Sequence, residues 1–137
     1  MTRTLVALAL MALSGCSSVD TSCDTASPLV GSWRYAAVRE TPTPGMIGGT
    51  LTFSTAGCGL LTGQLDVTET SGAGSSQRLA GMVTGALFDD GSIRFDAELP
   101  GGTRQHLATV RGDSLEGNWA SVSGAATSAG SFGGRRK

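Results

Sequence analysis

The sequence predicts an all-β protein, an eight-stranded antiparallel meander that closes into a barrel. Three observations support this fold class. Short segments alternate apolar and polar residues, most regularly from Ser92 to Leu99, and a period of two is typical of a half-buried strand. Glycine-rich turns separate these segments, and a glycine-centred unit of five residues recurs within them. Beyond the first fifteen residues, no segment has the apolar stripe of an amphipathic helix.

The first fifteen residues have the features of an export signal. Arg3 precedes an apolar run of nine residues, Leu5 to Leu13, and small residues follow. A helix of nine residues covers about 14 Å, less than half of a bilayer core of about 30 Å. We therefore expect residues 1–15 to be a cleaved signal peptide, residues 16–28 a polar tether, and residues 29–137 a single barrel domain.

The block Leu13-Ser14-Gly15-Cys16 resembles the lipobox of bacterial lipoproteins. The resemblance implies cleavage before Cys16, a diacylglycerol on its sulfur, and usually a further acyl chain such as palmitate on its amino group. Two or three acyl chains suffice for stable membrane anchoring. By the same resemblance, Ser17 favours sorting to the outer membrane of a two-membrane cell, with the domain in the periplasm or at the cell surface. An ordinary cleaved leader that carries a cysteine is the alternative.

Charge and cysteine content narrow the partners. Without Arg3, nine Lys and Arg stand against eleven Asp and Glu, a balance that predicts neither nucleic-acid binding nor a polybasic membrane patch. After lipidation Cys23 and Cys58 remain in an oxidising compartment, where we expect a disulfide, with free thiols as the alternative. The bond would close a loop of about 36 residues and stabilise the fold by roughly 3 to 4 kcal/mol. Two distant cysteines and one histidine are too few for zinc, so no metal or other cofactor is expected.

Eight strands fit between Pro28 and Lys137. They are centred near Trp33, Thr52, Gly63, Val83, Phe95, Ala108, Gly117 and Phe132. The turns Asp90-Gly91, Pro100-Gly101-Gly102 and Gly112-Asp113 suit hairpin reversals, because glycine adopts positive φ without strain. The longer connections at 40–45 and 71–76 are expected to be mobile loops at the rim.

The repeated unit is Leu-x-Gly-x-(Trp/Leu/Val), at residues 29–33, 61–65, 79–83 and 115–119. Its first, third and fifth residues share one face of a strand. A glycine on that face leaves room for strong coiling of the sheet or for a neighbouring ring to lie close.

Gly31-Ser32-Trp33, together with the units LTGQL (61–65) and LAGMV (79–83), resembles the calycin barrels, the lipocalin and avidin groups. The likeness covers most of residues 29–136. In lipocalins an arginine from near the chain end packs over the first-strand tryptophan, which implies that Arg135 or Arg136 covers Trp33. The polar ring with which avidins hold biotin has no counterpart in this sequence.

The inward face predicted by the alternation is apolar and contains the candidate ligand site. The residues expected to line it are Trp33, Tyr35, Phe53, Leu65, Val83, Phe95 and Trp119, with Tyr35 as a polar handle. Further inward residues are Leu51, Leu61, Val67, Leu79, Leu87, Ile93, Ala97, Leu99, Val110, Leu115 and Phe132. An eight-stranded barrel can be filled by such side chains or can hold one small ligand, and both alternatives stay open. An apolar cavity would take a lipid, a pigment or a similar molecule.

These observations predict a membrane-anchored envelope lipoprotein whose lipocalin-like barrel binds a small hydrophobic ligand. The alternative is a protein-binding envelope module with a filled core and no ligand. Small barrel-type protease inhibitors of bacteria, which have a similar Leu-x-Gly-x-Trp opening, provide the precedent by resemblance.

The motif Gly112-Asp113-Ser114-Leu115 shares its four letters with a family of serine esterases. That family places the motif before a helix and takes its histidine from a later Asp-x-x-His, and both features are absent here. In a hairpin turning at residues 112–113, Ser114 lies opposite Arg111, whereas His106 pairs near Trp119, roughly 17 Å along the strand. Because a serine without a base is a weak nucleophile, we expect no enzymatic activity.

Overall fold

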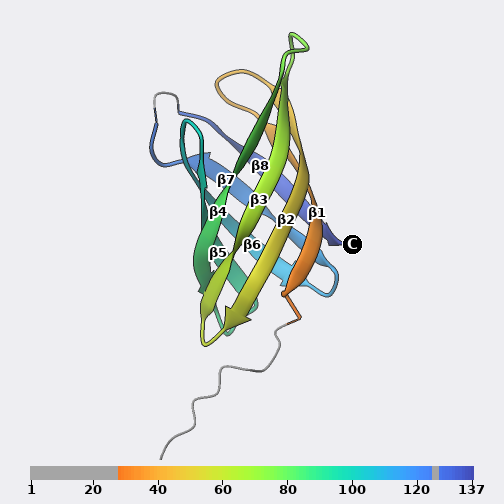
Figure 1. The fold of residues 1–137 in the computed structure, drawn as a ribbon, viewed down its shortest axis with the longest axis vertical. Coiled ribbons are helices and arrows are strands. Elements are labelled where there is room, and N and C mark those ends of the chain that lie inside the picture. Colours follow the sequence, from red (N-terminus) through yellow and green to blue (C-terminus); the bar gives the residue numbers. More distant parts are fainter. Residues whose placement is uncertain (1–27, 125–126) are drawn as a thin grey trace, which may run out of the picture.

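The barrel is closed and antiparallel throughout. The computed structural model describes residues 28–124 and 127–137. Its strands are β1 (Gly31–Arg39), β2 (Gly45–Gly57), β3 (Leu60–Ser71), β4 (Ser76–Leu87), β5 (Ser92–Leu99), β6 (Gly102–Arg111), β7 (Ser114–Ser121) and β8 (Ala129–Arg136). Each strand pairs with the next, and β8 pairs with β1 (Figure 1). The predicted eight-stranded meander is confirmed, and every predicted strand centre lies within its strand. No helix in the described residues is long and apolar enough to cross a bilayer.

The two ends of the barrel carry different connections (Figure 1). The end that we call the mouth carries the connections after β1, β3, β5 and β7. The end that we call the base carries the turns after β2, β4 and β6, and the described chain enters β1 there. The mouth and the point of chain entry therefore lie at opposite ends.

The alternation predicts the core well. All the apolar residues expected on the inward face are buried, except Leu87 and Val110, which are partly buried and pack against the core. Several buried residues were not among those expected from the alternation, and Leu29, Ile47 and His106 are three of them. His106 is the polar member of this group and is fully buried, so the interior is less uniformly apolar than expected.

The glycines of the repeated unit lie against the backbone of the adjacent strand. A Cβ added to Gly63, Gly81 or Gly117 would collide with a backbone carbonyl oxygen of that strand. The close neighbour is thus a strand backbone and not an aromatic ring. Gly31 differs, because its φ is +129° and the nearest atom to an added Cβ is Nη1 of Arg136, at 3.4 Å. Close approach of backbones permits the strong coiling that a closed sheet needs.

Trp33 closes the base. Its indole N–H donates to the carbonyl of Leu29 at 3.0 Å, and the guanidinium carbon of Arg136 lies 4.4 Å from the ring centroid. Arg136 therefore takes the position expected of an arginine near the chain end. Register explains the choice between the two candidates, because Arg136 pairs with Trp33 and Arg135 with the outward-facing Arg34.

The two connections expected to be loops, at 40–45 and 71–76, contain hydrogen bonds. The β1–β2 connection accepts a hydrogen bond at the carbonyl of Thr43 from Nε of Arg39, at 2.9 Å. The segment expected as a loop at 71–76 is a short reversal, in which the N–H of Ser71 donates to the carbonyl of Ser75 at 2.9 Å. The strands β3 and β4 therefore extend further into this segment than the sequence predicts.

Candidate binding site at the barrel mouth

Three charged side chains lie inside the mouth. Arg39 ends β1, Glu69 lies near the end of β3, and Arg104 lies near the start of β6. Their side chains are only 20%, 10% and 15% exposed. None of the three was expected as a site residue from the sequence, although the signal was present. Arg39 continues the inward parity of β1, Glu69 that of β3, and Arg104 that of the strand containing His106.

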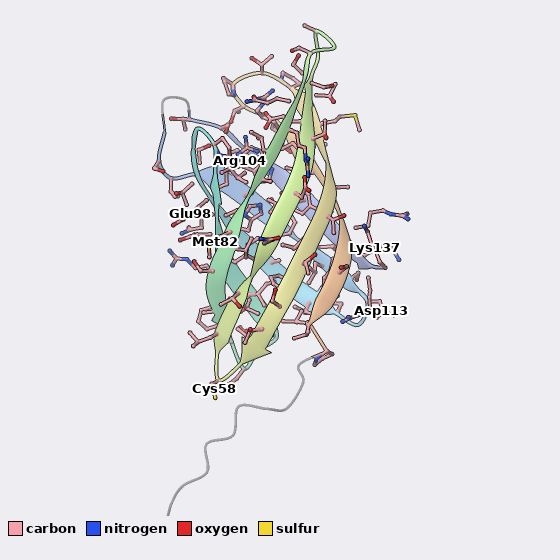
Figure 2. The ribbon with its side chains drawn as sticks, viewed as in Figure 1. Cys58, Met82, Glu98, Arg104, Asp113 and Lys137 are labelled. Atoms are coloured by element: carbon pink, nitrogen blue, oxygen red, sulfur yellow. The ribbon has the colours of Figure 1, made fainter. Side chains whose placement is uncertain are left out.

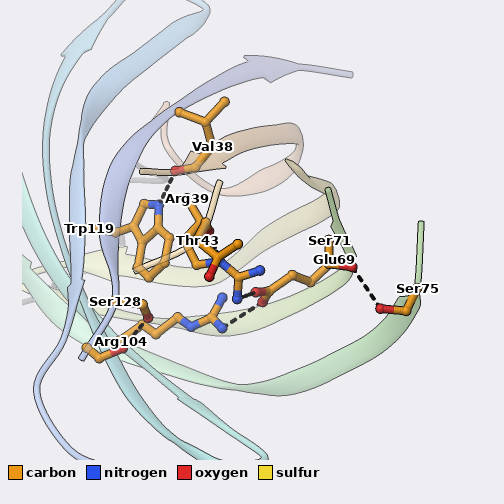
Figure 3. A network of polar contacts seen from close by, with 10 residues as sticks. Val38, Arg39, Thr43, Glu69, Ser71, Ser75, Arg104, Trp119 and Ser128 are labelled. Atoms are coloured by element: carbon orange, nitrogen blue, oxygen red, sulfur yellow. Dashed lines mark hydrogen bonds and ion pairs between the residues drawn. The ribbon is translucent and has the colours of Figure 1, made fainter. Parts of the chain in front are cut away.

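Glu69 lies between the two arginines (Figure 3). Nη1 of Arg39 forms an ion pair with Oε1 of Glu69, and Nη2 of Arg104 donates to Oε2 at 2.7 Å. The guanidinium carbon of Arg104 lies 4.7 Å from the centroid of the Trp119 ring. The indole N–H of Trp119 in turn donates to the carbonyl of Val38 at 3.1 Å. Each guanidinium group is thus held by more than one contact.

A pocket of about 260 Å³ opens at this network. Its apolar walls are Pro42, Leu79 and Pro100. Polar neutral residues complete the lining: Gln77, Ser121, Ser123 and Ser128. Among the described residues that line the pocket, Arg39, Glu69 and Arg104 are the charged ones. The pocket therefore carries two positive charges and one negative charge, and these charged groups can bind a small molecule that has polar groups.

A buried polar pair lies deeper in the barrel. The hydroxyl of Tyr35 lies 2.9 Å from Nε2 of His106, and Nδ1 of His106 lies 3.1 Å from the carbonyl oxygen of Arg104. Because a carbonyl only accepts, Nδ1 carries the hydrogen of the neutral ring, and Nε2 accepts a hydrogen bond from Tyr35. Burial lowers the pKa of His106 to about 4 and raises that of Tyr35. Both groups are therefore neutral at pH 7.

The seven residues predicted to line a ligand cavity are all buried, with exposed fractions of 0 to 3%. Phe95 stacks on His106 with centroids 4.4 Å apart and meets Phe53 edge to face at 5.7 Å. Tyr35 stacks on Phe132 at 5.5 Å. None of the seven is among the residues that line the mouth pocket. A ligand among them stays a prediction, and it requires these rings to move apart.

Ser114 and His106 are not brought together. The hydroxyl of Ser114 donates to the carbonyl of Arg111 at 3.0 Å near the base, and Ser114 pairs with Arg111 in the ladder. His106 pairs with Trp119, as the hairpin register predicted, and its ring is inside the barrel with Tyr35. His106, the only histidine of the chain, is therefore not positioned to act as the base for Ser114.

Cys58 lies in the β2–β3 turn at the base, at the opposite end of the barrel from Arg104 (Figure 2). It adopts a left-handed backbone conformation with a φ of 50°. Cys16 and Cys23 lie outside the described residues, as do the predicted signal peptide and most of the tether. Lipidation of Cys16 and the pairing of Cys23 with Cys58 stay predictions.

The chain is similar in fold to designed fluorescence-activating barrels. It superposes on a structure described as EF1p2_mFAP2b bound to DFHBI, with a TM-score of 0.63 and 14% identity, covering 80% of this chain and 94% of that one. The redesigned barrel mFAP1 bound to DFHBI gives 0.61 and 15%, covering 80% and 95%. A de novo designed fluorescence-activating β-barrel gives 0.59 and 18%, covering 79% and 93%. At these identities the likeness establishes the fold alone. No protein-family model and no curated protein matches the sequence.

Proposed function

We propose that this protein is a lipid-anchored barrel of the cell envelope that binds a small molecule at its mouth. The observation that carries the proposal is the pocket of about 260 Å³ over inward-facing, mostly buried charges. Two barrels of similar fold are described as bound to DFHBI, which supports ligand binding on this architecture. The charged side chains of the pocket lie beside its apolar walls, and polar groups at fixed positions orient a small ligand in its site.

The ligand is placed above the aromatic core and not within it. The rings of Tyr35, Phe95, His106 and Phe132 contact one another inside the barrel. A packed interior resists insertion because a guest must displace these contacts. The mouth needs no such displacement, and its proline and leucine walls provide the apolar contact expected of a hydrophobic ligand.

Anchoring through Cys16 is consistent with the position of the mouth. The described chain enters β1 at the base (Figure 1), so a tether from Cys16 would hold the base toward the membrane and leave the mouth accessible. Cys58 lies at that same end. A disulfide between Cys58 and Cys23 is within reach, because the eight residue steps from Cys23 to Gly31 can span about 26 Å. The sequence after the lipobox favours the outer membrane.

Two measurements test this function. A clickable palmitate analogue should label the wild-type protein and the Cys23→Ala variant, but not Cys16→Ala.

The two tryptophans report the ligand position, since the indole N–H of Trp119 lies near the mouth and that of Trp33 at the base. In NMR spectra of the full-length chain in detergent, small amphiphiles should shift the indole N–H signal of Trp119 and not that of Trp33. Failure of every amphiphile to move Trp119 would contradict ligand binding at the mouth.

A second candidate is protein binding, favoured by an apolar groove outside the barrel. The groove, of about 830 Å³, runs over β1, β2 and β3 and includes Ala36, Val38, Pro44, Met46, Gly48 and Thr68. Val38 and Met46 are 39% and 70% exposed. If this face binds a protein, a photo-crosslinker at Met46 should capture it, and Val38→Glu should abolish capture while Val122→Glu, at another exposed site, should not.

A further inference from the structure

We propose that the mouth pocket selects a compact organic anion, a carboxylate with a small apolar body. This inference depends on the proposed function and names the class of ligand. The pocket lining contains two positively charged residues, Arg39 and Arg104, and one negatively charged residue, Glu69. The remaining described lining residues are uncharged, so the pocket has an excess of one positive charge.

The excess charge is partly removed from water. The two arginine side chains are 20% and 15% exposed, and that of Glu69 is 10% exposed. Removing a charge from water is costly unless a partner of opposite charge compensates it. Glu69 compensates one guanidinium group, so a second carboxylate would complete the pairing. Guanidinium groups match carboxylates in shape as well as charge, because their N–H donors form a planar fork.

Both arginines keep N–H donors that such a ligand could use. Arg39 uses Nε on Thr43 and Nη1 on Glu69. Arg104 uses Nη2 on Glu69, and its guanidinium group lies over Trp119. A guanidinium group carries five N–H donors, so both arginines keep donors beyond these described contacts. Since their side chains are already held, binding loses little side-chain entropy.

The pocket also limits the size and shape of the ligand. At about 260 Å³ it lies below the roughly 300 to 1,000 Å³ of sites for drug-sized molecules. Pro42, Leu79 and Pro100 offer apolar contact beside the charges. A single ring or a short branched chain bearing one carboxylate satisfies both features. Inorganic phosphate would satisfy the charge but leave the apolar walls uncovered.

The test compares benzoate with benzamide, which has almost the same shape and no charge. We expect benzoate to shift the Trp119 indole signal of the full-length chain and to bind at least about tenfold more tightly than benzamide, the difference expected of one charge-assisted hydrogen bond. Inorganic phosphate should bind more weakly than benzoate. Raising the salt concentration should weaken benzoate binding and leave benzamide binding unchanged.

Three variants locate the effect. Arg104→Gln removes one donor group and should weaken benzoate binding about tenfold or more, whereas Glu69→Gln removes the competing carboxylate and should tighten it. Arg34→Gln is the matched control, because Arg34 is an exposed residue on the outward face of β1. It removes the same charge from the protein and should leave binding unchanged. An unchanged Trp33 indole signal in each variant verifies that the barrel is intact.

Three outcomes overturn the inference. If benzamide and benzoate shift Trp119 with equal affinity, the mouth binds small molecules without selecting an anion, and the proposed function survives alone. If Arg34→Gln weakens benzoate binding as much as Arg104→Gln, the attraction comes from the overall charge and not from the pocket. If neither probe nor any other amphiphile shifts Trp119, the proposed function fails with it.

Discussion

His106 should make the stability of the barrel depend on pH in a defined window. The ring is fully buried and neutral, with a pKa lowered by burial from 6.5 to about 4. In the unfolded chain it takes up a proton near its ordinary pKa, whereas in the folded barrel it resists protonation. The unfolded state therefore binds more protons as the pH falls below 6.5, and folding loses stability until the folded pKa is reached.

The magnitude follows from the two pKa values. The gap between 6.5 and about 4, at 1.36 kcal/mol per pH unit, corresponds to a loss of about 3 kcal/mol between pH 7 and pH 4. About 2 kcal/mol of this loss should occur by pH 5. A domain of this size is stable by about 5 to 15 kcal/mol, so the effect is a large fraction of the total.

Urea unfolding followed by tryptophan fluorescence measures the effect directly. With a slope of about 2 kcal/mol per molar urea, the midpoint should fall by about 1 M between pH 7 and pH 5. The attribution is clean because His106 is the only histidine in the chain. The carboxyl groups of Asp66 and Asp90 have pKa values lowered below 3.8, by hydrogen bonds from Arg78 and Ser92. Their contributions are lost only below that pH.

A double variant serves as the control. Changing Tyr35→Phe together with His106→Phe replaces both partners of the buried hydrogen bond by apolar rings, so neither is left unsatisfied. Its urea midpoint should be nearly constant from pH 7 to pH 5. A wild-type midpoint that is equally constant over that range, or a double variant that keeps the wild-type slope, would refute the assignment of the pH dependence to this ring.

Three further predictions concern packing and charge. Gly117→Ala should destabilise the barrel by about 3 kcal/mol or more in urea unfolding, because its Cβ meets a neighbouring carbonyl oxygen; Gly133→Ala, with ordinary contact distances, should cost much less. Arg136→Ala should lower the free energy of unfolding by about 1 to 2 kcal/mol through loss of the cation over the first-strand indole, and an equal loss in Arg135→Ala would argue against that contact. Glu69→Ala leaves two guanidinium groups without their shared carboxylate and should lower the free energy of unfolding by about 2 kcal/mol or more. Added salt should reduce this loss, because it screens the repulsion between the two guanidinium groups. A loss that does not change with salt would argue against repulsion as the cause.

The fold was predictable because, in a strand with one buried face, burial alternates from each residue to the next. With side chains alternating between two faces, the apolar parity from Ser92 to Leu99 fixes which face is inside. Turn glycines then give the number of strands. The register of the β6–β7 hairpin also followed from its turn, which is why His106 was correctly placed opposite Trp119.

The candidate site was not predictable to the same degree. Arg39, Glu69 and Arg104 have inward parity, but a charged residue on that parity is ordinarily a sign that a strand has left the core. These residues come from three strands that are not consecutive in the sequence. Only in the closed barrel do their side chains meet, so that the charge of Glu69 compensates the charges of the two arginines. The signal that could have found them is the presence, near the ends of the expected strands, of inward-facing residues with opposite charges.

The neighbours of the repeated glycines depended on register in a similar way. The sequence indicated that small residues were required at Gly63, Gly81 and Gly117, but not what lies against them. The answer, a carbonyl oxygen of the adjacent strand, requires knowing how each strand is offset from the next. The same holds for the choice of Arg136 over Arg135 above Trp33, which one residue of offset would reverse.

The seam between β1 and β8 has a consequence for biogenesis. β1 is made first and β8 is the last strand of the barrel, so β1 has no partner on one side until the far end of the domain has emerged. A chain shortened at its C-terminal end therefore leaves one edge of β1 unpaired, and an unpaired strand edge can pair with another chain.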